Sequence, residues 1–383
     1  MKILLIDVNC KKSSTGKIVY DIYSYLNEHG DEAAVCYGRG EKIDEKDIYK
    51  FGLDWETYLH AFLTRITGFT GCFSYFSTRR LIRFIEEFKP DVVHIHELHA
   101  YFVNIKPLIQ YLKCRDIKTV MTLHCEFAYT GKCGQSMECE KWKKECKKCP
   151  RLNDYVGTLL FDHTNYMFRQ KRELFEDYEN LQIVAPSSWL ADRAAKSFLG
   201  KHQIRVIHNG VDTSVFYPRD AGMLRKQLGI TDDERVVLAL APNLMSEIKG
   251  GEYVLQLANK LKSEKIRFVL VGVDGEHKVK LPNVVFVGHI NDSDTISQYY
   301  SAADAFVICS KRENYPTTCL EAQACGTPVY GFSAGGTEET FLQKDKHFVD
   351  YGDVEALTVL ISAIPNKSMK MSNEIRSLAT DSI

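Results

Sequence analysis

Two carboxylates in the second half of the chain could bind ligand hydroxyls or lie on an ordinary solvated helix surface. Glu313 and Glu321 lie on either side of seven uncharged residues in the stretch "RENYPTTCLEAQACGTPV". Pro316 and Thr317 between them predict the start of a helix, where free N–H groups and the helix dipole favour an anion such as a diphosphate. Carboxylates accept hydrogen bonds from paired hydroxyls. The pattern predicts that Glu321 binds a ribose and Glu313 a sugar, with an ordinary solvated helix surface as the alternative.

A cluster of cysteines is typical of a metal site. Cys133, Cys139, Cys146 and Cys149 occur in "KCGQSMECEKWKKECKKCP", which ends in C-x-x-C and a proline. Four thiolates are common ligands of tetrahedral structural zinc. The first spacing is longer than in common zinc ribbons, so free or redox-active thiols are an equal alternative to zinc.

The elements that must position these residues alternate between strand and helix. The first series contains strands "KILLIDV", "AAVCYG", "PDVVHIH", "KTVMTLH", "LQIVAP" and "IRVIHNG", with helices such as "GKIVYDIYSYLNEHG", "RRLIRFIEEF", "NIKPLIQYLK" and "SSWLADRAAKSF" between them. Such alternation predicts a parallel sheet that is covered by helices.

A second series of the same kind begins near Arg235. It contains strands "RVVLALA", "IRFVLVG", "NVVFVG", "DAFVICS" and "TPVYGF", with helices "GGEYVLQLANKLK", "SDTISQYYSAA" and "TTCLEAQACG". The segment "NGVDTSVFYPRD" before it has the composition of a linker. We therefore predict two Rossmann-like domains, residues 1–212 and 213–383, that face each other across a cleft. Ligands of such sheets lie at the carboxyl ends of the strands, where Glu313 and Glu321 are expected.

The composition gives no reason to propose nucleic acid as a partner, because 49 Lys and Arg residues nearly balance 50 Asp and Glu residues. The apolar run in "MKILLIDV" is too short for a signal peptide, and no other stretch is long enough to span a bilayer. We expect a cytoplasmic protein with reduced cysteines.

Several motifs together resemble the retaining GT-B glycosyltransferases of sequence family 4. The motifs are "SSTGK", "HIHELHAYFVNIKPL", "TLHC", "APSSWLA", "VIHNGVDTSVF", "KGG", "GHI", "ENYPTTCLEAQACGTPV" and "GGTEE", and they span nearly the whole chain. The resemblance implies a nucleotide-sugar donor and retained configuration at the transferred sugar carbon. It also favours ligand binding by the two glutamates over the helix-surface alternative.

The resemblance implies roles for individual residues. His124, at the end of "KTVMTLH", would lie beside the sugar and its bond to phosphate. Lys249 would contact the donor phosphate, while Asn243 stands where many members have an arginine. A core histidine and a solvated lysine are the corresponding structural alternatives. The implied catalytic residues are His124, Lys249 and Glu313, and the implied donor-binding residues are Gly16, Asn243, Lys249, Asn314, Tyr315, Pro316, Thr317 and Glu321.

Other residues near strand ends have less defined roles. Alternation along a strand predicts His94 and His96 on one face, so that His96, Glu97 and His99 line the acceptor side or hold a loop. Lys311 and Arg312 could share the phosphate charge with Lys249. The "SSTGK" segment lacks the first glycine of a P-loop, and no G-x-G-x-x-G follows the first strand, which argues against a nicotinamide or flavin enzyme.

No carboxylate pair is an evident magnesium site. Asp292 and Asp294 in "DSD" are the nearest candidate, but this sequence is typical of a helix cap. We therefore expect metal-independent catalysis without a cofactor, by front-face departure and attack, with structural zinc as the only metal.

The segment "WETYLHAFLTRITGF" predicts an amphipathic helix, and most such apolar stripes pack in a core. Arginines and lysines nearby make contact with an anionic membrane surface an alternative. The apolar residues are Trp55, Tyr58, Leu59, Phe62, Leu63 and Ile66, and the basic ones are Arg65, Arg79, Arg80, Arg83 and the lysines from Lys141 to Lys148.

The sequence thus predicts a hexosyltransferase that moves a sugar from a nucleotide donor, UDP-linked in particular, to a glycan or lipid-linked acceptor in polysaccharide biosynthesis. We expect it in the cytoplasm or at the inner face of the cell membrane. Two alternatives stay open: a GT-B sugar-nucleotide epimerase, and a non-catalytic scaffold stabilised by zinc. Relatives usually end in a helix that returns to the first domain, and we expect that helix to be absent here.

Overall fold

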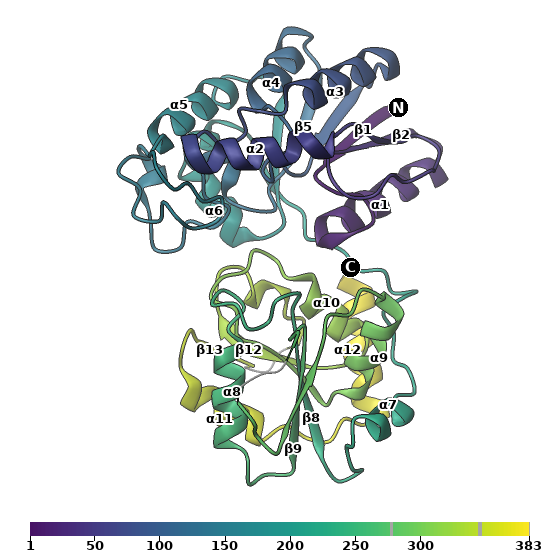
Figure 1. Cartoon of the computed structure of the whole chain (residues 1–383). Helices are drawn as coiled ribbons and strands as arrows, with labels where there is room; N and C mark the ends of the chain where they lie inside the picture. Colours follow the sequence, from purple (N-terminus) through teal and green to yellow (C-terminus); the bar gives the residue numbers. More distant parts are fainter. Residues whose placement is uncertain (276–278, 344–346, 383) are drawn as a thin grey trace. The chain divides into compact units, whose positions relative to one another are not determined.

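The chain forms two compact units in the computed structural model, which describes residues 1–275, 279–343 and 347–382 (Figure 1). The N-terminal unit contains residues 1–207 and the C-terminal unit residues 208–383. Residue 212, the predicted domain boundary, lies in the coil that follows residue 207.

The N-terminal unit has a seven-stranded parallel sheet in the order β3-β2-β1-β4-β5-β6-β7. Central strands such as β1 are buried along most of their length, as expected for strands covered on both faces. The strands are β1 (Lys2–Asp7), β2 (Glu32–Tyr37), β3 (Ile48–Lys50), β4 (Val92–Ile95), β5 (Lys118–Thr122), β6 (Leu181–Ala185) and β7 (Ile204–Val206).

Helices connect these strands, and they bury apolar residues against the sheet. Val19, Leu81 and Leu108 are fully buried examples from three of the helices. The helices are α1 (Ser13–Glu28), α2 (Asp54–Thr67), α3 (Tyr75–Phe88), α4 (Ile105–Cys114), α5 (Thr164–Phe175) and α6 (Ser188–Ala195).

The C-terminal unit repeats this design with a six-stranded parallel sheet in the order β10-β9-β8-β11-β12-β13. Its strands are β8 (Arg235–Leu240), β9 (Ile266–Val271), β10 (Val284–Val287), β11 (Ala305–Ile308), β12 (Val329–Ser333) and β13 (Phe348–Asp350). Its helices are α7 (Gly222–Gln227), α8 (Gly251–Lys260), α9 (Ser293–Ala302), α10 (Thr317–Ala324), α11 (Val354–Ser362) and α12 (Met369–Ser382).

The strand orders locate the ligand-binding edge of each sheet. Within each unit the first three strands run outward in one direction and the later strands in the other, as in the Rossmann fold. The order reverses between β1 and β4 and between β8 and β11. In such sheets the ligand lies at the carboxyl ends of the two strands at the reversal. The prediction of two Rossmann-like domains is confirmed.

A terminal helix packs within the C-terminal unit, so the expectation that no helix returns to the first domain stays a prediction. Helix α12 ends the chain and packs beside α10, with Ile375 and Ala379 buried. Arg376 donates to the backbone oxygens of Phe216, 3.4 Å away, and Ala324, 3.3 Å away. The polar composition of "NEIRSLATDSI" hides this helix in the sequence, because only one residue per turn is buried.

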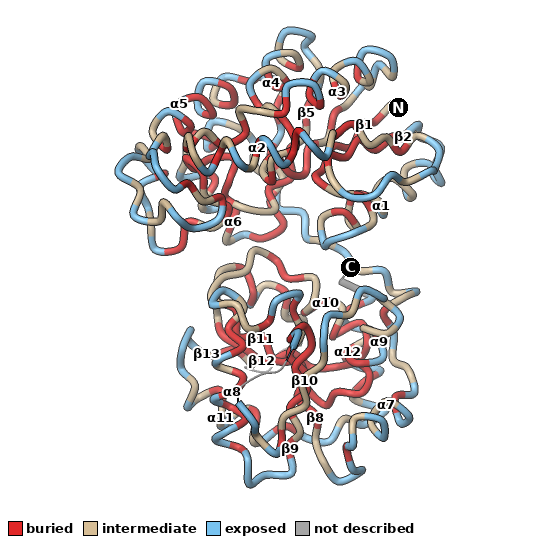
Figure 2. The backbone as a smooth tube through the Cα atoms, viewed as in Figure 1, coloured by how far each residue is buried: buried red, intermediate tan, exposed pale blue. Residues whose placement is uncertain are grey.

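The expectation that the apolar stripe of α2 packs in the core is also wrong. Trp55, Tyr58 and Phe62 are exposed, whereas the buried positions of α2 are Glu56, Thr57, His60 and Thr64. Figure 2 shows exposed residues of this helix in pale blue. Hydrogen bonds from the polar side chains, described below, hold the helix in this orientation. No helix in the described part of the chain is both long and apolar enough to span a membrane.

Candidate functional site

Lys249 and Glu313 meet at the carboxyl ends of β8 and β11, where the strand order of the C-terminal unit reverses. Lys249 lies in the loop from β8 to α8, and Glu313 lies in the loop from β11 to α10. The Lys249 Nζ donates to Glu313 Oε1 over 2.6 Å, and both side chains are partly exposed. A cation and a carboxylate are therefore presented together at the ligand-binding edge of this sheet.

Backbone contacts fix both residues of this pair. Gly250, which follows Lys249, has φ +70°, and a Cβ there would lie 2.1 Å from the carbonyl oxygen of Cys309. Only glycine allows this approach of the β8–α8 loop to the end of β11. The carbonyl oxygen of Glu313 accepts from Gly336 N over 3.0 Å, so the loop after β12 holds the other partner.

Glu321 is placed by helix α10, as the sequence predicts. It is the fifth residue of that helix, and its Oε2 accepts from the Tyr300 hydroxyl over 3.1 Å. Tyr300 is fully buried, so the contact fixes one end of the Glu321 carboxylate. Burial and the Glu321 charge raise the pKa of Tyr300 well above its usual value. The hydroxyl therefore stays protonated and remains a donor.

The residues between Glu313 and Glu321 form the turn into α10. Pro316 precedes the helix as its N-cap, without a side-chain cap, and Thr317 is its first residue, as predicted. The Tyr315 ring stacks on His208, with centroids 4.6 Å apart, and the Tyr315 carbonyl accepts from Asn209 Nδ2 over 3.3 Å. Asn314 is half-buried beside them.

Asn243 lies in an exposed turn of the β8–α8 loop, where its carbonyl accepts from Ser246 N over 3.1 Å. The structure therefore groups most of the predicted donor residues at one edge of the C-terminal sheet. Gly16 and His124 belong to the N-terminal unit. Gly16 is in the first turn of α1, where a Cβ would lie 3.3 Å from the backbone of Asn9, so a tight helix–loop contact accounts for it.

Three histidines gather at the carboxyl ends of β4 and β5 in the N-terminal unit. His94 and His96 lie on one face, as predicted, with ring centroids 4.1 Å apart. His96 Nδ1 and His124 Nε2 are hydrogen-bonded at 3.0 Å, and His94 Nε2 contacts Thr122 Oγ1 at 2.8 Å. Burial lowers the pKa of all three imidazoles, that of His94 to about 4. His124 is therefore a neutral hydrogen-bonding group at pH 7.

Glu97, His99 and Cys125 form a second cluster next to these histidines. Glu97 Oε2 lies 2.8 Å from His99 Nε2 and 3.8 Å from Cys125 Sγ. Burial opposes charge on His99, yet the Glu97 carboxylate raises the pKa of His99 well above its usual value. One ligand atom from each residue lies within 4.8 Å of the others, so the three are chemically able to hold a metal ion.

Asp7 ends β1 at the strand-order reversal of the N-terminal unit. Its Oδ2 accepts from Thr15 Oγ1 over 3.1 Å and from Asn9 N over 3.3 Å, while its buried Oδ1 has no hydrogen-bond partner among the residues that the structure describes. Burial, with a contribution from Glu97, raises the pKa of Asp7 to about 7. A carboxyl group that titrates near neutral pH thus lies at the ligand-binding edge of this sheet.

The four clustered cysteines lie in one half-buried loop, and none is in a disulfide. The Cys133 and Cys149 thiols are hydrogen-bonded, which lowers the pKa of Cys149 to about 6, and Gly131 N donates to Cys146 Sγ over 3.3 Å. Among the residues that the structure places, no three of these sulfurs lie within 4.8 Å of one another. The zinc site stays a prediction, and it requires the loop to close around the ion.

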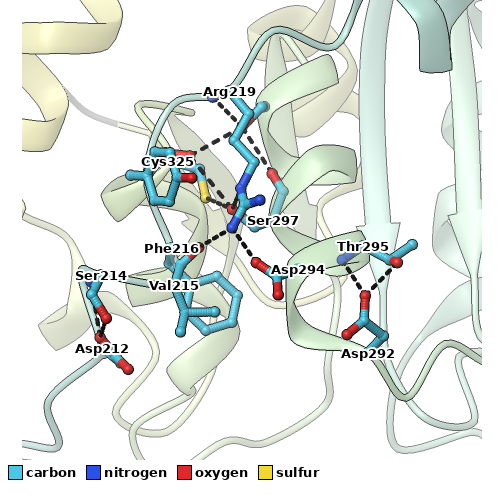
Figure 3. Close-up of polar contacts among 12 residues, drawn as sticks. Asp212, Ser214, Val215, Phe216, Arg219, Asp292, Asp294, Thr295, Ser297 and Cys325 are labelled. Atoms are coloured by element: carbon cyan, nitrogen blue, oxygen red, sulfur yellow. Dashed lines mark hydrogen bonds and ion pairs between the residues drawn. The ribbon is translucent and has the colours of Figure 1, made fainter.

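Asp292 and Asp294 are structural, as predicted (Figure 3). Asp292 is the N-cap of α9, where its Oδ2 accepts from Thr295 N over 2.7 Å. Asp294 forms an ion pair with Arg219, which also donates to Ser297 Oγ over 3.1 Å. The Arg219 contacts anchor the end of the linker segment to α9.

Two family descriptions match this chain. Residues 15–215 match Glycosyltransferase Family 4, and residues 234–365 match Glycosyl transferases group 1. The first match covers more than half of the 383 residues. The chain belongs to glycosyltransferase family 4. The resemblance predicted from the motifs is confirmed.

One relative of this family 4 chain is WcaC of Escherichia coli K12, whose name describes a glycosyl transferase of colanic acid biosynthesis. The two are 30% identical over 263 residues, which are 67% of this chain and 62% of WcaC. The chain thus matches less than two thirds of that relative's length.

Solved structures confirm the GT-B fold. The sucrose-phosphate synthase of Thermosynechococcus elongatus aligns with a TM-score of 0.68 and 17% identity, over 99% of this chain and 94% of that one. HepE of Anabaena, in complex with UDP-glucose, aligns with a TM-score of 0.65 and 16% identity, over 100% and 95% of the two chains. At these identities the likeness shows the fold alone.

Sequence reasoning missed three residues at these sites, Asp7, Cys125 and Tyr300. Asp7 could have been found from the sequence, because it is a carboxylate at the carboxyl end of a predicted strand. Glu313 has the same relation to the strand "DAFVICS". Tyr300 carries none, since its contact with Glu321 depends on how α9 packs against α10.

Proposed function

We propose that this chain transfers a sugar from a nucleotide-sugar donor, a UDP-sugar in particular, to a hydroxyl of a glycan or lipid-linked acceptor in polysaccharide biosynthesis. The observation that carries the proposal is the Lys249–Glu313 pair at the strand-order reversal, beside the start of α10. The UDP-glucose complex of HepE and the name of WcaC support the donor and the biosynthetic setting.

The donor diphosphate would bind where positive charge gathers. Lys249 supplies one full charge, and the start of α10 supplies backbone N–H groups and the positive end of a helix dipole. Both stabilise charge that develops on the leaving diphosphate as the bond to the sugar breaks. We therefore propose metal-independent catalysis. Lys311, which pairs with Glu247 at 3.1 Å, can add a second cation if that surface pair opens.

The two glutamates would bind the two hydroxyl-bearing ends of the donor. Lys249 holds Oε1 of Glu313, so we assign the carboxylate's further accepting capacity to a sugar hydroxyl. Tyr300 holds Glu321 in the same way for the ribose. In the N-terminal unit, neutral His124, bound to His96, is our candidate for a further hydrogen bond to the sugar. We propose retention of configuration by front-face attack, without a covalent nucleophile from the protein.

Isothermal calorimetry with UDP tests this assignment. We expect Glu321→Ala to weaken UDP binding at least about tenfold, because a ribose contact is worth on the order of 1–3 kcal/mol. Glu313→Ala should bind UDP like the parent but turn over more slowly, since UDP lacks the sugar. Glu264→Ala, an exposed glutamate of the same unit, is the control. Unchanged UDP affinity in Glu321→Ala would remove the ribose assignment.

Product analysis separates transfer from epimerisation. Incubation with UDP-sugars and a glycan acceptor should release UDP and give a product with the anomeric configuration of the donor. An epimerase would instead return a UDP-sugar of altered configuration. If a broad panel of nucleotide sugars and nucleoside diphosphates shows no binding, the proposal of a donor site is wrong.

A further inference from the structure

Helix α2 has the reverse of the usual amphipathic arrangement. Its buried face carries Glu56, Thr57, His60 and Thr64. Its outward face carries Trp55, Tyr58, Leu59 and Phe62, which are 55%, 74%, 44% and 56% exposed. A surface helix normally turns its apolar stripe toward the core. In α2 other contacts must hold the stripe outward, and the apolar side chains are left exposed.

The cause lies in hydrogen bonds that the polar face makes with the start of α3. The Glu56 carboxylate accepts from Phe76 N over 2.8 Å and from Ser77 N over 2.7 Å. A carboxylate is stabilised there by the positive end of the α3 dipole. Ser77 Oγ also donates to Glu56, over 2.6 Å, so the helix is held through a fully buried contact.

His60 adds a second polar anchor on the same face. Ser74 Oγ donates to the Tyr101 carbonyl over 3.0 Å, so His60 Nδ1, 2.7 Å from Ser74 Oγ, must be the donor in their hydrogen bond. Thr64 Oγ1 donates to the Phe69 carbonyl over 2.8 Å. Rotating α2 to bury its apolar stripe would break these bonds and leave buried polar groups unsatisfied.

The exposed apolar surface continues beyond α2. Tyr75 and Phe76 at the start of α3 are 53% and 54% exposed, and the Phe76 ring lies 6.0 Å from that of Trp55. The loop that carries Leu159, Leu160 and Phe161 is tied to the end of α2, because Leu159 N donates to the Arg65 carbonyl over 2.7 Å. These three side chains are at least 54% exposed. We call the residues from α2, α3 and this loop the aromatic face.

The aromatic face is as large as the largest apolar patches of typical monomers. Six half-exposed side chains on α2 and α3 alone offer on the order of 600 Å², since aromatic residues have roughly 150–250 Å² each. The largest apolar patch of a typical monomer is about 300–600 Å² and is often functional. Because patches of this size are often functional, we look for an apolar partner of the face.

Basic residues beside the aromatic face indicate the kind of partner. Arg79, Arg80 and Arg83 line a groove of about 800 Å³ together with Trp55 and Phe76. The single acidic residue in that lining is Glu86. Arginines beside Trp, Tyr and Phe are the composition of protein surfaces that lie in the headgroup region of an anionic bilayer.

We propose that the aromatic face docks the N-terminal unit onto the surface of an anionic phospholipid bilayer. Trp55, Tyr58 and Phe62 enter the interface, and Arg79 and Arg83 contact lipid phosphates. The helix lies in the plane of the surface, because its 14 residues are too few to cross the hydrocarbon region. The proposal does not rest on the enzymatic activity, although it fits a lipid-linked acceptor.

Sedimentation with lipid vesicles tests the proposal. We expect the parent to pellet with vesicles that contain phosphatidylglycerol and to pellet less with phosphatidylcholine alone. Tyr58→Ser with Phe62→Ser should reduce binding to both vesicle types. Tyr25→Ser is the matched control, because Tyr25 is a 61% exposed tyrosine on α1 of the same unit.

A variant with two charge reversals distinguishes the contribution of the basic groove to vesicle binding from that of the aromatic residues. Arg79→Glu with Arg83→Glu should lower binding to anionic vesicles about tenfold or more, because each basic residue near such a surface contributes roughly 1 kcal/mol. Lys262→Glu with Lys370→Glu makes the same change in net charge at exposed sites of the other unit. Circular dichroism should show all these variants folded, since the changed side chains are exposed.

Two outcomes would overturn the proposal. One is equal sedimentation of the parent and the Tyr58, Phe62 variant with anionic vesicles. The other is a parent that does not bind vesicles but forms a dimer, while the same variant is monomeric. The aromatic face would then be a contact between two copies of this chain. Either result leaves the calorimetric test of the nucleotide site unaffected, because that test contains no lipid.

Discussion

Lys249 is the residue on which the proposed chemistry depends most, because it pairs with Glu313 and is our proposed contact to the diphosphate. Position 243 is an asparagine, so no arginine there adds a second positive charge beside the diphosphate. The β8–α8 loop holds Lys249 in place before any donor binds, so its charge is preorganised, and preorganised charge contributes most to catalysis.

We expect Lys249→Ala to lower turnover roughly a hundred- to a thousand-fold, the size typical of removing one preorganised group that stabilises developing charge. Steady-state transfer, measured with magnesium and with a chelator, checks both the loss and the metal independence. Lys262→Ala, an exposed lysine after α8, is the control. Turnover within about threefold of the parent would move the phosphate contact to another residue such as Lys311.

Asp7 predicts a specific dependence of stability on pH. Its pKa is raised to about 7 in the folded protein, from an ordinary value of 3.8. The folded state therefore holds a proton that the unfolded state releases between pH 4 and pH 7. Stability falls as pH rises through this window, because deprotonation stabilises the unfolded state while the folded state keeps its proton.

Asp7→Asn should remove this loss, since the amide is of similar shape and stays neutral. We expect the variant to be more stable than the parent at pH 8, by on the order of 4 kcal/mol, because a shift of about three pKa units is worth about 1.4 kcal/mol per unit, and similar to it at pH 4. Urea unfolding at several pH values measures the difference. If both proteins show the same change in stability with pH, Asp7 does not titrate in this range.

At the scale of elements, the site of the C-terminal unit depends on how closely the β8–α8 loop approaches β11. Gly229 provides a matched comparison for Gly250, because both have positive φ, +68° and +70°, but a Cβ at Gly229 would meet nothing within 4 Å. Alanine at Gly229 reports the loss of stability from the backbone conformation alone. Alanine at Gly250 adds the loss from the clash of its Cβ with Cys309.

We expect Gly229→Ala to cost about 1 kcal/mol, the price of a left-handed conformation for alanine. Gly250→Ala should cost several kcal/mol more, because its Cβ would lie 2.1 Å from the Cys309 carbonyl and the loop must move. Thermal unfolding with UDP-binding measurements would show both effects. Equal losses of stability in the two variants would mean that the β8–α8 loop moves easily. Its close approach to β11 would then not fix the position of Lys249.

The cysteine loop predicts a metal-dependent stability. If its four thiols hold zinc, protein purified without chelator should contain about one equivalent, and a chelator should lower the thermal stability of the N-terminal unit but leave a short transfer assay unchanged. Cys146→Ser should lose the metal, whereas Cys114→Ser, at an exposed cysteine on α4, should retain it. Less than about a tenth of an equivalent in the parent would exclude the site.

For the whole molecule, the sequence predicted the two sheets because fully buried parallel strands appear as continuous apolar runs. It also predicted Glu321 in the first turns of α10, because proline marks the helix start. The orientation of α2 could not be predicted. Periodicity shows that Trp55, Tyr58 and Phe62 share a face, but Glu56 and His60 decide where that face points, through partners 14 to 21 residues away.

The short edge strands β3 and β13 and the terminal helix α12 escaped prediction for a related reason. Strand β13 has three residues, one of them buried, and α12 owes its place to Arg376 and a few apolar contacts. Neither carries a periodic signal of its own. Contacts with distant segments, such as that between Tyr300 and Glu321, decide these features.

The separate hydrophobic cores of the two units have a consequence for how the protein melts. One pair of clusters, around Leu4 and Leu5, lies in the first unit, and the other pair, around Leu270 and Phe306, lies in the second. A calorimetric scan should therefore record two heat-absorption peaks. UDP at about a hundred times its dissociation constant adds roughly 2.7 kcal/mol to the free energy of unfolding of the unit that binds it. One peak should thus shift upward with nucleotide while the other stays, and the stationary peak would identify the half that can unfold while the donor remains bound.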